Sequence, residues 1–228
     1  MGVHPLDFPA WSALNGRHAG FALGGDSARR YDPTVNVFAG VAGRDAESFA
    51  ALSALVAEHG DVAMLEADEP PLPPGLKFAS IDLGVQMVEA RPSEGPPPTL
   101  EAVPLTDADA AAMLALAHLT QPGPFFKRTH KLGDFFGVKV DGRLAAMAGE
   151  RMKPQGYTEV SGVCVHPDFR GRGYAAGLTR IVAGRIRARG EVPFLHAYAH
   201  NKPAITLYEA LGWELRREVL MMRLTKAA

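Results

Sequence analysis

Residues 157–190 restrict the fold of this chain strongly, because their hydrophobic pattern changes its period across one short turn. Tyr157 to His166 alternates as a β-strand does, whereas the apolar residues from Gly173 to Arg189 recur at helical spacing. Gly190 is a natural end for that helix. The sequence therefore predicts a strand, a turn and a helix in direct succession, which is a unit of α/β layer folds.

The turn between them reads H-P-D-F-R-G-R-G-Y-A, from His166 to Ala175. Backbone N–H groups at a helix start, together with the positive end of the helix dipole, favour an anion. Glycines at 171 and 173 allow a close approach of the backbone, and Arg170 and Arg172 add donors suited to phosphate. The turn lacks the Lys-Ser/Thr ending of a P-loop. Taken alone, it fits a diphosphate cradle, a basic RNA loop or a solvated bend.

The rest of the chain also reads as mixed α/β. Asp141-Gly142 predicts a two-residue hairpin turn, and Asn201 predicts a helix cap with Pro203 in the first turn. The further predicted strands are 34–41, 61–67, 77–90, 100–105, 135–140, 144–152, 193–199 and 213–224. The further predicted helices lie in 9–23, 44–59, 106–118 and 202–211.

A proline-rich stretch divides the sequence. Eight of the 18 prolines lie between Pro70 and Pro98, and R-P-S-E-G-P-P-P cannot continue a helix or an inner strand. We expect an N-terminal α/β domain over residues 1–92, a linker over 93–99 and a second domain over 100–228. Residues 1–98 carry 6 Lys and Arg against 13 Asp and Glu, whereas residues 99–228 carry 18 against 12. The basic half favours an anionic ligand.

Composition limits the partners and the compartment. The net charge of -1 argues against nucleic acid as a partner, and no apolar run is long enough to predict a membrane span. Cys164 is the single cysteine, which fits a reducing, cytoplasmic compartment. The N-terminus lacks the pattern of a signal peptide.

A second motif, N-K-P-A-I-T-L-Y-E-A-L-G-W, runs from Asn201 to Trp213. Together with T-E-V-S-G-V-C-V-H-P-D-F-R-G-R-G-Y-A, it resembles the GNAT superfamily of acetyltransferases, and more narrowly its FR47-like branch. The resemblance covers about residues 100–224 and is specific, because two motifs occur in the right order and at the right separation. It implies a central, mixed, mostly antiparallel sheet flanked by helices. Residues 1–98 would form a smaller preceding α/β domain, compatible with a degenerate GNAT-like half.

The resemblance further implies acetyl-CoA as the cosubstrate and no metal. The coenzyme would lie between the strand ending at Val165 and the strand ending at Ala199, with its diphosphate on the turn amides. A backbone N–H near Val163 would polarise the thioester carbonyl. The coenzyme-binding residues predicted in this way are Val163, Cys164, Val165, Arg170, Gly171, Arg172, Gly173, Tyr174, Ala175 and Asn201.

Two catalytic roles also follow from the resemblance. Tyr208 occupies the place of the acid that protonates the leaving thiolate, and a phenol with a pKa of about 10 is a donor at neutral pH. Glu159 matches the base of some members, and partial desolvation would raise its pKa. Core packing against Ala204 and Leu211 is the other interpretation of Tyr208. The other interpretation of Glu159 is an exposed glutamate at a strand edge. Whether Glu159 or a chain of water molecules acts as the base stays open.

Cys164 and the histidines are weaker candidates, for a covalent acetyl-cysteine and a zinc site respectively. By strand alternation Cys164 shares a face with Val160 and Gly162, and a cysteine inside a V-x-V run is usually an inert core residue. His196 and His200 flank a later strand without a carboxylate or thiol at metal-ligand spacing. We therefore expect neither a covalent acetyl-cysteine nor a zinc site.

The acceptor side is less specified. The 121–132 loop falls where the superfamily contacts its acceptor, and Phe125 and Phe126 are the candidate contacts; a packed surface loop is the alternative. We expect transfer of an acetyl group to a primary amine, by direct attack in a ternary complex, with a small-molecule amine as the acceptor. The alternative is a non-catalytic acyl-CoA sensor or interaction module on the same fold. The acceptor, the acyl chain length and a homodimer stay open.

Overall fold

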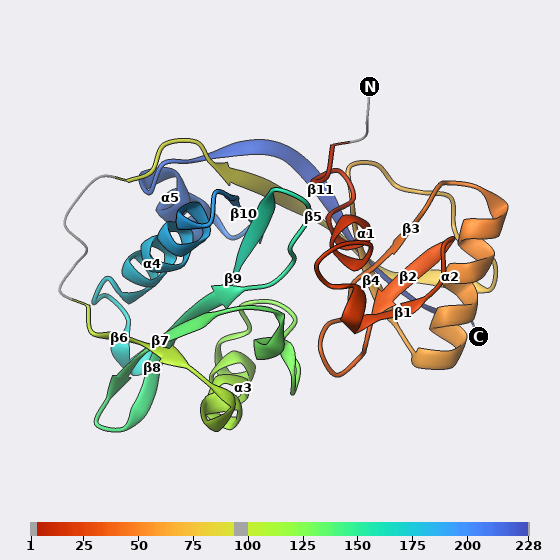
Figure 1. The fold of residues 1–228 in the computed structure, drawn as a ribbon. Helices are drawn as coiled ribbons and strands as arrows, with labels where there is room; N and C mark the ends of the chain where they lie inside the picture. The colour runs from red at the N-terminus through yellow and green to blue at the C-terminus, as the bar shows by residue number, and fades with distance from the viewer. Residues whose placement is uncertain (1–3, 94–99, 228) are drawn as a thin grey trace.

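The computed structural model describes residues 4–93 and 100–227 as two sheets with helices around them (Figure 1). A three-stranded sheet has the order β1-β2-β3, and an eight-stranded sheet has the order β4-β11-β5-β10-β9-β8-β7-β6. Strands β9 and β10 pair in parallel, and the other neighbouring strands of the large sheet are antiparallel. The predicted α/β class with a mixed, mostly antiparallel sheet and a smaller preceding sheet is confirmed.

The first part of the chain builds the small sheet and the helices beside it. Asp45 caps α2 by accepting a hydrogen bond from Ser48 N, 2.8 Å away, and Gly60 ends the helix at a φ of 82°. The elements are α1 (Pro9–Leu14), η1 (Ala19–Phe21), β1 (Ala22–Gly24), β2 (Ala28–Tyr31), β3 (Ala39–Val41), α2 (Ala46–His59) and β4 (Val62–Glu66).

Strands β1 and β2 were not predicted from the sequence, and the strand predicted over 34–41 shortens to β3. The sequence of β2, A-R-R-Y, does not alternate in hydrophobicity, yet Arg30 is buried. Its guanidinium reaches the carbonyl oxygen of Gly60 at 2.6 Å and that of Asp61 at 3.3 Å. The buried arginine is therefore satisfied by a segment distant in sequence, which no local pattern reveals.

Strands β5 (Leu76–Glu89) and β11 (Trp213–Lys226) form one long antiparallel ribbon. In Figure 1 this ribbon runs between the part that carries α2 and the part that carries α4. Strand β4 pairs with one end of β11, and β10 pairs with the other end of β5. The large sheet therefore takes strands from both sides of the predicted linker, whose residues 94–99 lie outside the described residues.

The second part supplies the remaining strands and helices. The predicted capping box of Thr106 and Asp109 is present, and Asp141 and Gly142 form the hairpin turn with φ of 50° and 76°. The elements are β6 (Ala102–Leu105), η2 (Asp107–Asp109), α3 (Ala110–Thr120), η3 (Thr129–Leu132), β7 (Phe135–Val140), β8 (Arg143–Glu150), β9 (Tyr157–Val165), η4 (Pro167–Phe169), α4 (Tyr174–Ala188), β10 (Val192–Tyr198) and α5 (Lys202–Ala210).

Helices cover both faces of the large sheet. Leu178, Val182 and Ile186 of α4 pack on one face, in a core that also holds Trp213. Helix α3 packs on the opposite face against a core that includes Met147. Across the described ranges, none of the helices combines the length and hydrophobicity that a bilayer span requires. The two layers hold β9 between them, and β9 leads into the site described next.

Candidate active site

Strands β9 and β10 lie side by side over their first residues. Their parallel pairing runs from Tyr157 opposite Val192 to Glu159 opposite Phe194. Beyond this point β10 continues beside β5 as far as Tyr198, while β9 continues beside β8. The two strands therefore separate and open a cleft within the sheet.

A β-bulge interrupts β9 where it borders the cleft. Gly149 of β8 lies opposite Ser161, and Met147 lies opposite Cys164, so β9 holds one more residue than β8 between these pairs. Gly162 lies in the interval with a φ of 64°, a left-handed conformation that favours glycine.

The bulge changes which side of the sheet each residue faces. Val160 packs in the core beneath α4, whereas Cys164 packs on the α3 side. The expectation that Cys164 shares a face with Val160 is therefore wrong, because the extra residue shifts the alternation by one. Val163 and Val165 instead pack on the α4 side.

The R-G-R-G turn, Arg170–Gly173, leads from β9 into α4 and presents its backbone to open space. Gly171 and Gly173 both have a φ of 75°, and a Cβ atom at either position would have no neighbour within 4 Å. In the described part of the chain, no acceptor is found for the backbone N–H groups of residues 171–176. Arg172 lies over the ring of Phe169, with Cζ 5.2 Å from the centroid. The helix start therefore offers free donors, an arrangement that suits an anion.

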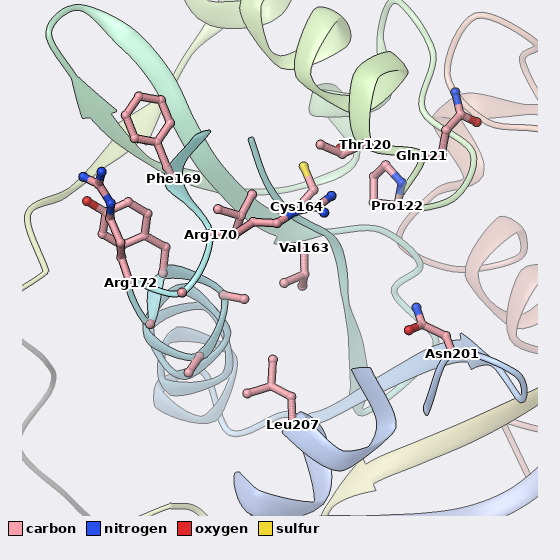
Figure 2. A pocket seen from close by; sticks show the side chains of 16 residues that line it. Thr120, Gln121, Pro122, Val163, Cys164, Phe169, Arg170, Arg172, Asn201 and Leu207 are labelled. Atoms are coloured by element: carbon pink, nitrogen blue, oxygen red, sulfur yellow. The ribbon is translucent and has the colours of Figure 1, made fainter. Parts of the chain in front are cut away.

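A cavity of about 400 Å³ lies between the turn and the separated strands. In Figure 2, Arg172 lies at one end of it and Gln121 and Asn201 lie toward the other. Each predicted coenzyme-binding residue lines this cavity, although their binding of a coenzyme stays a prediction. The other lining residues, of which Gln121 and Pro122 belong to the 121–132 loop, are Thr120, Gln121, Pro122, Phe169, Ala176 and Leu207.

Asn201 and Tyr208 lie on α5 or at its start. Asn201 caps the helix, because its Oδ1 accepts from Ala204 N at 3.3 Å, and its side chain borders the cavity. Tyr208 is buried next to Leu207, with its ring centroid 6.1 Å from that of Trp213. Burial raises the pKa of Tyr208 to about 12, so the phenol stays protonated at neutral pH. Tyr208 is a member of the core beneath α4 and is not among the described lining residues of the cavity, so its position fits core packing, and its role as an acid stays a prediction.

Cys164 is an unreactive thiol in this setting. Its side chain is buried, and burial raises its pKa to about 11, against the smaller opposing effects of hydrogen bonds with Thr120 and Met147. A thiol rather than a thiolate is a poor nucleophile. The structure thus gives no support to a covalent acetyl-cysteine.

Glu159 differs from the expectation of a raised pKa. Its carboxylate is completely buried, which by itself would raise the pKa, but the charge and hydrogen bonds of Arg151, together with His196, outweigh burial and lower the pKa to about 2. Arg151 Nε and Nη2 donate to Oε2 at 2.8 Å and Oε1 at 2.6 Å, and His196 Nδ1 lies 2.7 Å from Oε1. These contacts stabilise the ionised carboxylate, so they disfavour the predicted role of Glu159 as a base.

The 121–132 loop packs against the first part of the chain. Arg128 N donates to Thr34 O at 2.9 Å. Thr129 Oγ1 donates to Val35 O at 2.7 Å and accepts from Phe126 N at 2.7 Å. The loop is therefore held in place by a segment nearly one hundred residues earlier in the sequence.

Phe125 and Phe126, the candidate acceptor contacts, lie outside the lining of the cavity within the described residues. Phe125 is buried edge-on against Phe135, with centroids 5.8 Å apart, and it also lies near Gly162. Phe126 is half-buried. Both stay predictions as acceptor contacts.

Three features of the site were not predicted from the sequence: the bulge at Gly162, the pairing of Arg151 with Glu159, and the contact of Glu159 with His196. Arg151 and Glu159 are eight residues apart on neighbouring chain segments, and His196 comes from β10. A carboxylate at the start of a buried strand is the signal that a partner arginine should exist, because a buried charge is normally paired. Across residues 4–93 and 100–227, no three His, Cys, Asp or Glu side chains gather as a metal site would require.

Comparisons with known proteins place these features in a family. Residues 136–222 match the family model described as FR47-like protein. A crystal structure of a candidate GNAT-family acetyltransferase from Novosphingobium aromaticivorans is 40% identical, with a TM-score of 0.89 over 99% of this chain and 100% of that one. A GCN5-related N-acetyltransferase from Kribbella flavida shares the fold at 18% identity, with a TM-score of 0.65 over 96% and 94% of the two chains. No curated protein sequence matches significantly.

Proposed function

Because the chain belongs to the GNAT family of acetyltransferases, we propose that it transfers an acetyl group from acetyl-CoA to a primary amine. Membership of the family supports acyl transfer in general. The coenzyme, the acyl group and the direct attack of the amine are parts of the proposal.

The structure of the R-G-R-G turn is the main observation that supports the proposal. The unpaired N–H groups of residues 171–176 and the open space at Gly171 and Gly173 fit a diphosphate. The cavity extends from there between β9 and the start of α5, where Val163 and Asn201 would flank the pantetheine arm. This donor set would receive the diphosphate of coenzyme A on the turn.

The chemistry requires a neutral amine near the thioester carbonyl and a donor near the sulfur. The bulge at Gly162 disturbs the pairing of β9, so a backbone N–H of this region is available in our proposal to polarise the carbonyl. Tyr208 would protonate the departing thiolate, because its phenol carries a proton at neutral pH; its raised pKa makes it a weaker acid than an ordinary phenol.

Removal of the amine proton falls to water in this proposal. Both carboxylate oxygens of Glu159 are engaged by Arg151 and His196, and its low pKa makes it a weak base. Glu159 would then act by holding Arg151 and His196 in place.

Two measurements test the proposal together. Acetyl-CoA should raise the melting temperature by an amount that increases with its concentration. A panel of primary amines should then release free thiol from acetyl-CoA. Protection without thiol release for any amine would favour the non-catalytic sensor, and the absence of protection at millimolar acetyl-CoA would contradict both functions.

Substitution of Tyr208 by Phe tests the acid. Tyr208→Phe should lower kcat by roughly 100-fold or more while leaving the thermal protection by acetyl-CoA unchanged, because the hydroxyl acts on the leaving group rather than in binding. The matched control is Tyr157→Phe, which removes a hydroxyl that contacts His4 and does not line the cavity. Equal turnover of Tyr208→Phe and the wild type would remove Tyr208 from the mechanism.

A further inference from the structure

Arg151 keeps one donor group unused although it is buried. It follows β8 directly and is 7% exposed, with Cζ 4.8 Å from the ring centroid of Phe38. Nε and Nη2 bind Glu159, which occupies one edge of the guanidinium. Among the described residues, no acceptor is found for Nη1. Nη1 is not among the described buried side-chain atoms that lack a partner, so solvent reaches it and this edge of the guanidinium is open to a ligand.

The unused edge faces the cavity end of the 121–132 loop. A Cβ atom at Gly123 would lie 3.9 Å from Arg151 Nη1, and Gly123 has a φ of 126°. Its neighbours Gln121 and Pro122 line the cavity, and Figure 2 shows them away from the end that holds Arg172. Arg151 is not among the described lining residues of the cavity, but its Nη1 lies beside Gly123, which directly follows the lining residues Gln121 and Pro122.

The surrounding loop is fixed rather than adaptable. Thr129 is buried and bridges Phe126 N and Val35 O, and Arg128 N binds Thr34 O. These bonds hold the loop in position beside Arg151 before any ligand arrives. A donor pre-placed in this way binds a matching acceptor at little cost in ordering.

A chain of contacts holds the partner of Arg151 in place. It leads from Glu159 through His196 and Gln86 to Arg216, which binds Asp7. Arg217 binds the same carboxylate of Asp7. Glu159 is therefore fixed by His196 as well as by Arg151, and this fixes the orientation of the guanidinium.

We propose that Arg151 binds a carboxylate of the acceptor through its Nη1 edge, so that the acceptor is an amine that also carries a carboxylate. This inference rests on the proposed acetyl transfer and names its substrate class. A guanidinium binds two carboxylates at once, one on each edge, whereas a lysine ammonium lacks this geometry. Glu159 fills the first edge and fixes the direction of the second.

The test compares pairs of acceptors that differ in the carboxylate alone. Amino acids and their primary amides are assayed by thiol release from acetyl-CoA, with kcat/KM corrected for the fraction of neutral amine. The wild type should prefer the carboxylate by about 10- to 100-fold, as expected for a hydrogen bond with a charged group in a desolvated site. In Arg151→Gln the preference should fall to within about 3-fold, with the thermal protection by acetyl-CoA unchanged.

Two further variants separate this role from a structural one. Arg151→Lys keeps a charge beside Glu159, and should lose most of the preference because it lacks the second edge. Arg189→Gln, which removes an arginine bound to Glu150 at 2.6 Å, should keep the full preference. Retention of the whole preference in Arg151→Lys would overturn the inference.

The outcomes also distinguish the inference from the function beneath it. Acetylation of amines without any preference for a carboxylate in the wild type would overturn the inference and leave the function standing. If the protein shows no thiol release and no protection by acetyl-CoA, the function itself is rejected. If the coenzyme protects but no amine reacts, N-acetyl amino acids and their amides are compared as ligands in the presence of coenzyme A. Equal protection by both would then count against Arg151 as the carboxylate site.

Discussion

The R-G-R-G turn and the proposed acceptor end at Arg151 are built on opposite principles. The R-G-R-G turn uses one continuous segment whose donors are backbone N–H groups, and its glycines face open space. The end around Arg151 uses buried side chains from separate segments, joined by ion pairs and hydrogen bonds. The first end should tolerate changes of side chain but not of backbone conformation. The second should tolerate neither the loss of a charge nor the loss of a partner.

The largest effect should follow from Glu159→Gln. This change leaves Arg151 buried without its charged partner, and we expect a loss of about 3–5 kcal/mol in the free energy of unfolding at pH 7. Chemical denaturation measures it. If the variant does not fold, the double variant Arg151→Met/Glu159→Gln should recover stability, because both charges are then removed.

The stabilities of the wild type and of Glu159→Gln should also depend differently on pH. The pKa of Glu159 is lowered in the folded protein from an ordinary value of 4.5 to about 2, so the wild type has the full stabilisation above about pH 5. As the pH falls from 4.5 toward 2, about 3 kcal/mol of it should be lost. The difference in stability between the wild type and Glu159→Gln should shrink over this range. A difference that stays constant down to pH 3 would show that Glu159 is not ionised with a low pKa.

A smaller effect is expected at the turn. Gly173→Val places a β-branched residue at a φ of 75°, a conformation that such residues strongly disfavour. The turn should then move, and the affinity for acetyl-CoA should fall by about 100-fold, near 2.7 kcal/mol. Calorimetric titration measures it. Arg172→Ala removes a neighbouring side chain but keeps the backbone, so its affinity for acetyl-CoA should fall by no more than about 10-fold. A larger loss of affinity in Arg172→Ala than in Gly173→Val would mean that side chains, not backbone amides, hold the ligand.

The smallest effect concerns the contact between the 121–132 loop and the first part of the chain. Thr129→Val keeps the shape but removes the bonds to Val35 O and Phe126 N, at an expected loss of about 2 kcal/mol in stability. The KM for the amine should rise severalfold while the affinity for acetyl-CoA stays unchanged. Thr106→Val, which weakens the cap before α3, should reduce stability without changing that KM. An unchanged KM in Thr129→Val would mean that the loop does not shape the acceptor end.

The same contrast explains what could be predicted from the sequence. The turn, the capping box of Thr106 and the hairpin turn at Asp141 depend on residues close in the chain, and a local pattern is enough to find them. The low pKa of Glu159 depends on Arg151 and on His196, which meet it in space rather than in a motif. The bulge at Gly162 was missed because one extra residue changes the face without changing the hydrophobic composition of the strand.

The position of β5 has a consequence for any attempt to divide this polypeptide. Strand β5 ends before the proline-rich run at residues 91–98. In the sheet, however, β5 lies between β10 and β11, which both come after that run in the sequence. A break in the chain at that stretch would leave the downstream fragment without β4 and β5, so that β11 would lose both neighbours and β10 would have a bare edge prone to self-association. The two pieces, made together, should find each other through the same strand. The stretch is therefore a site for splitting and reassembling the enzyme rather than for trimming it.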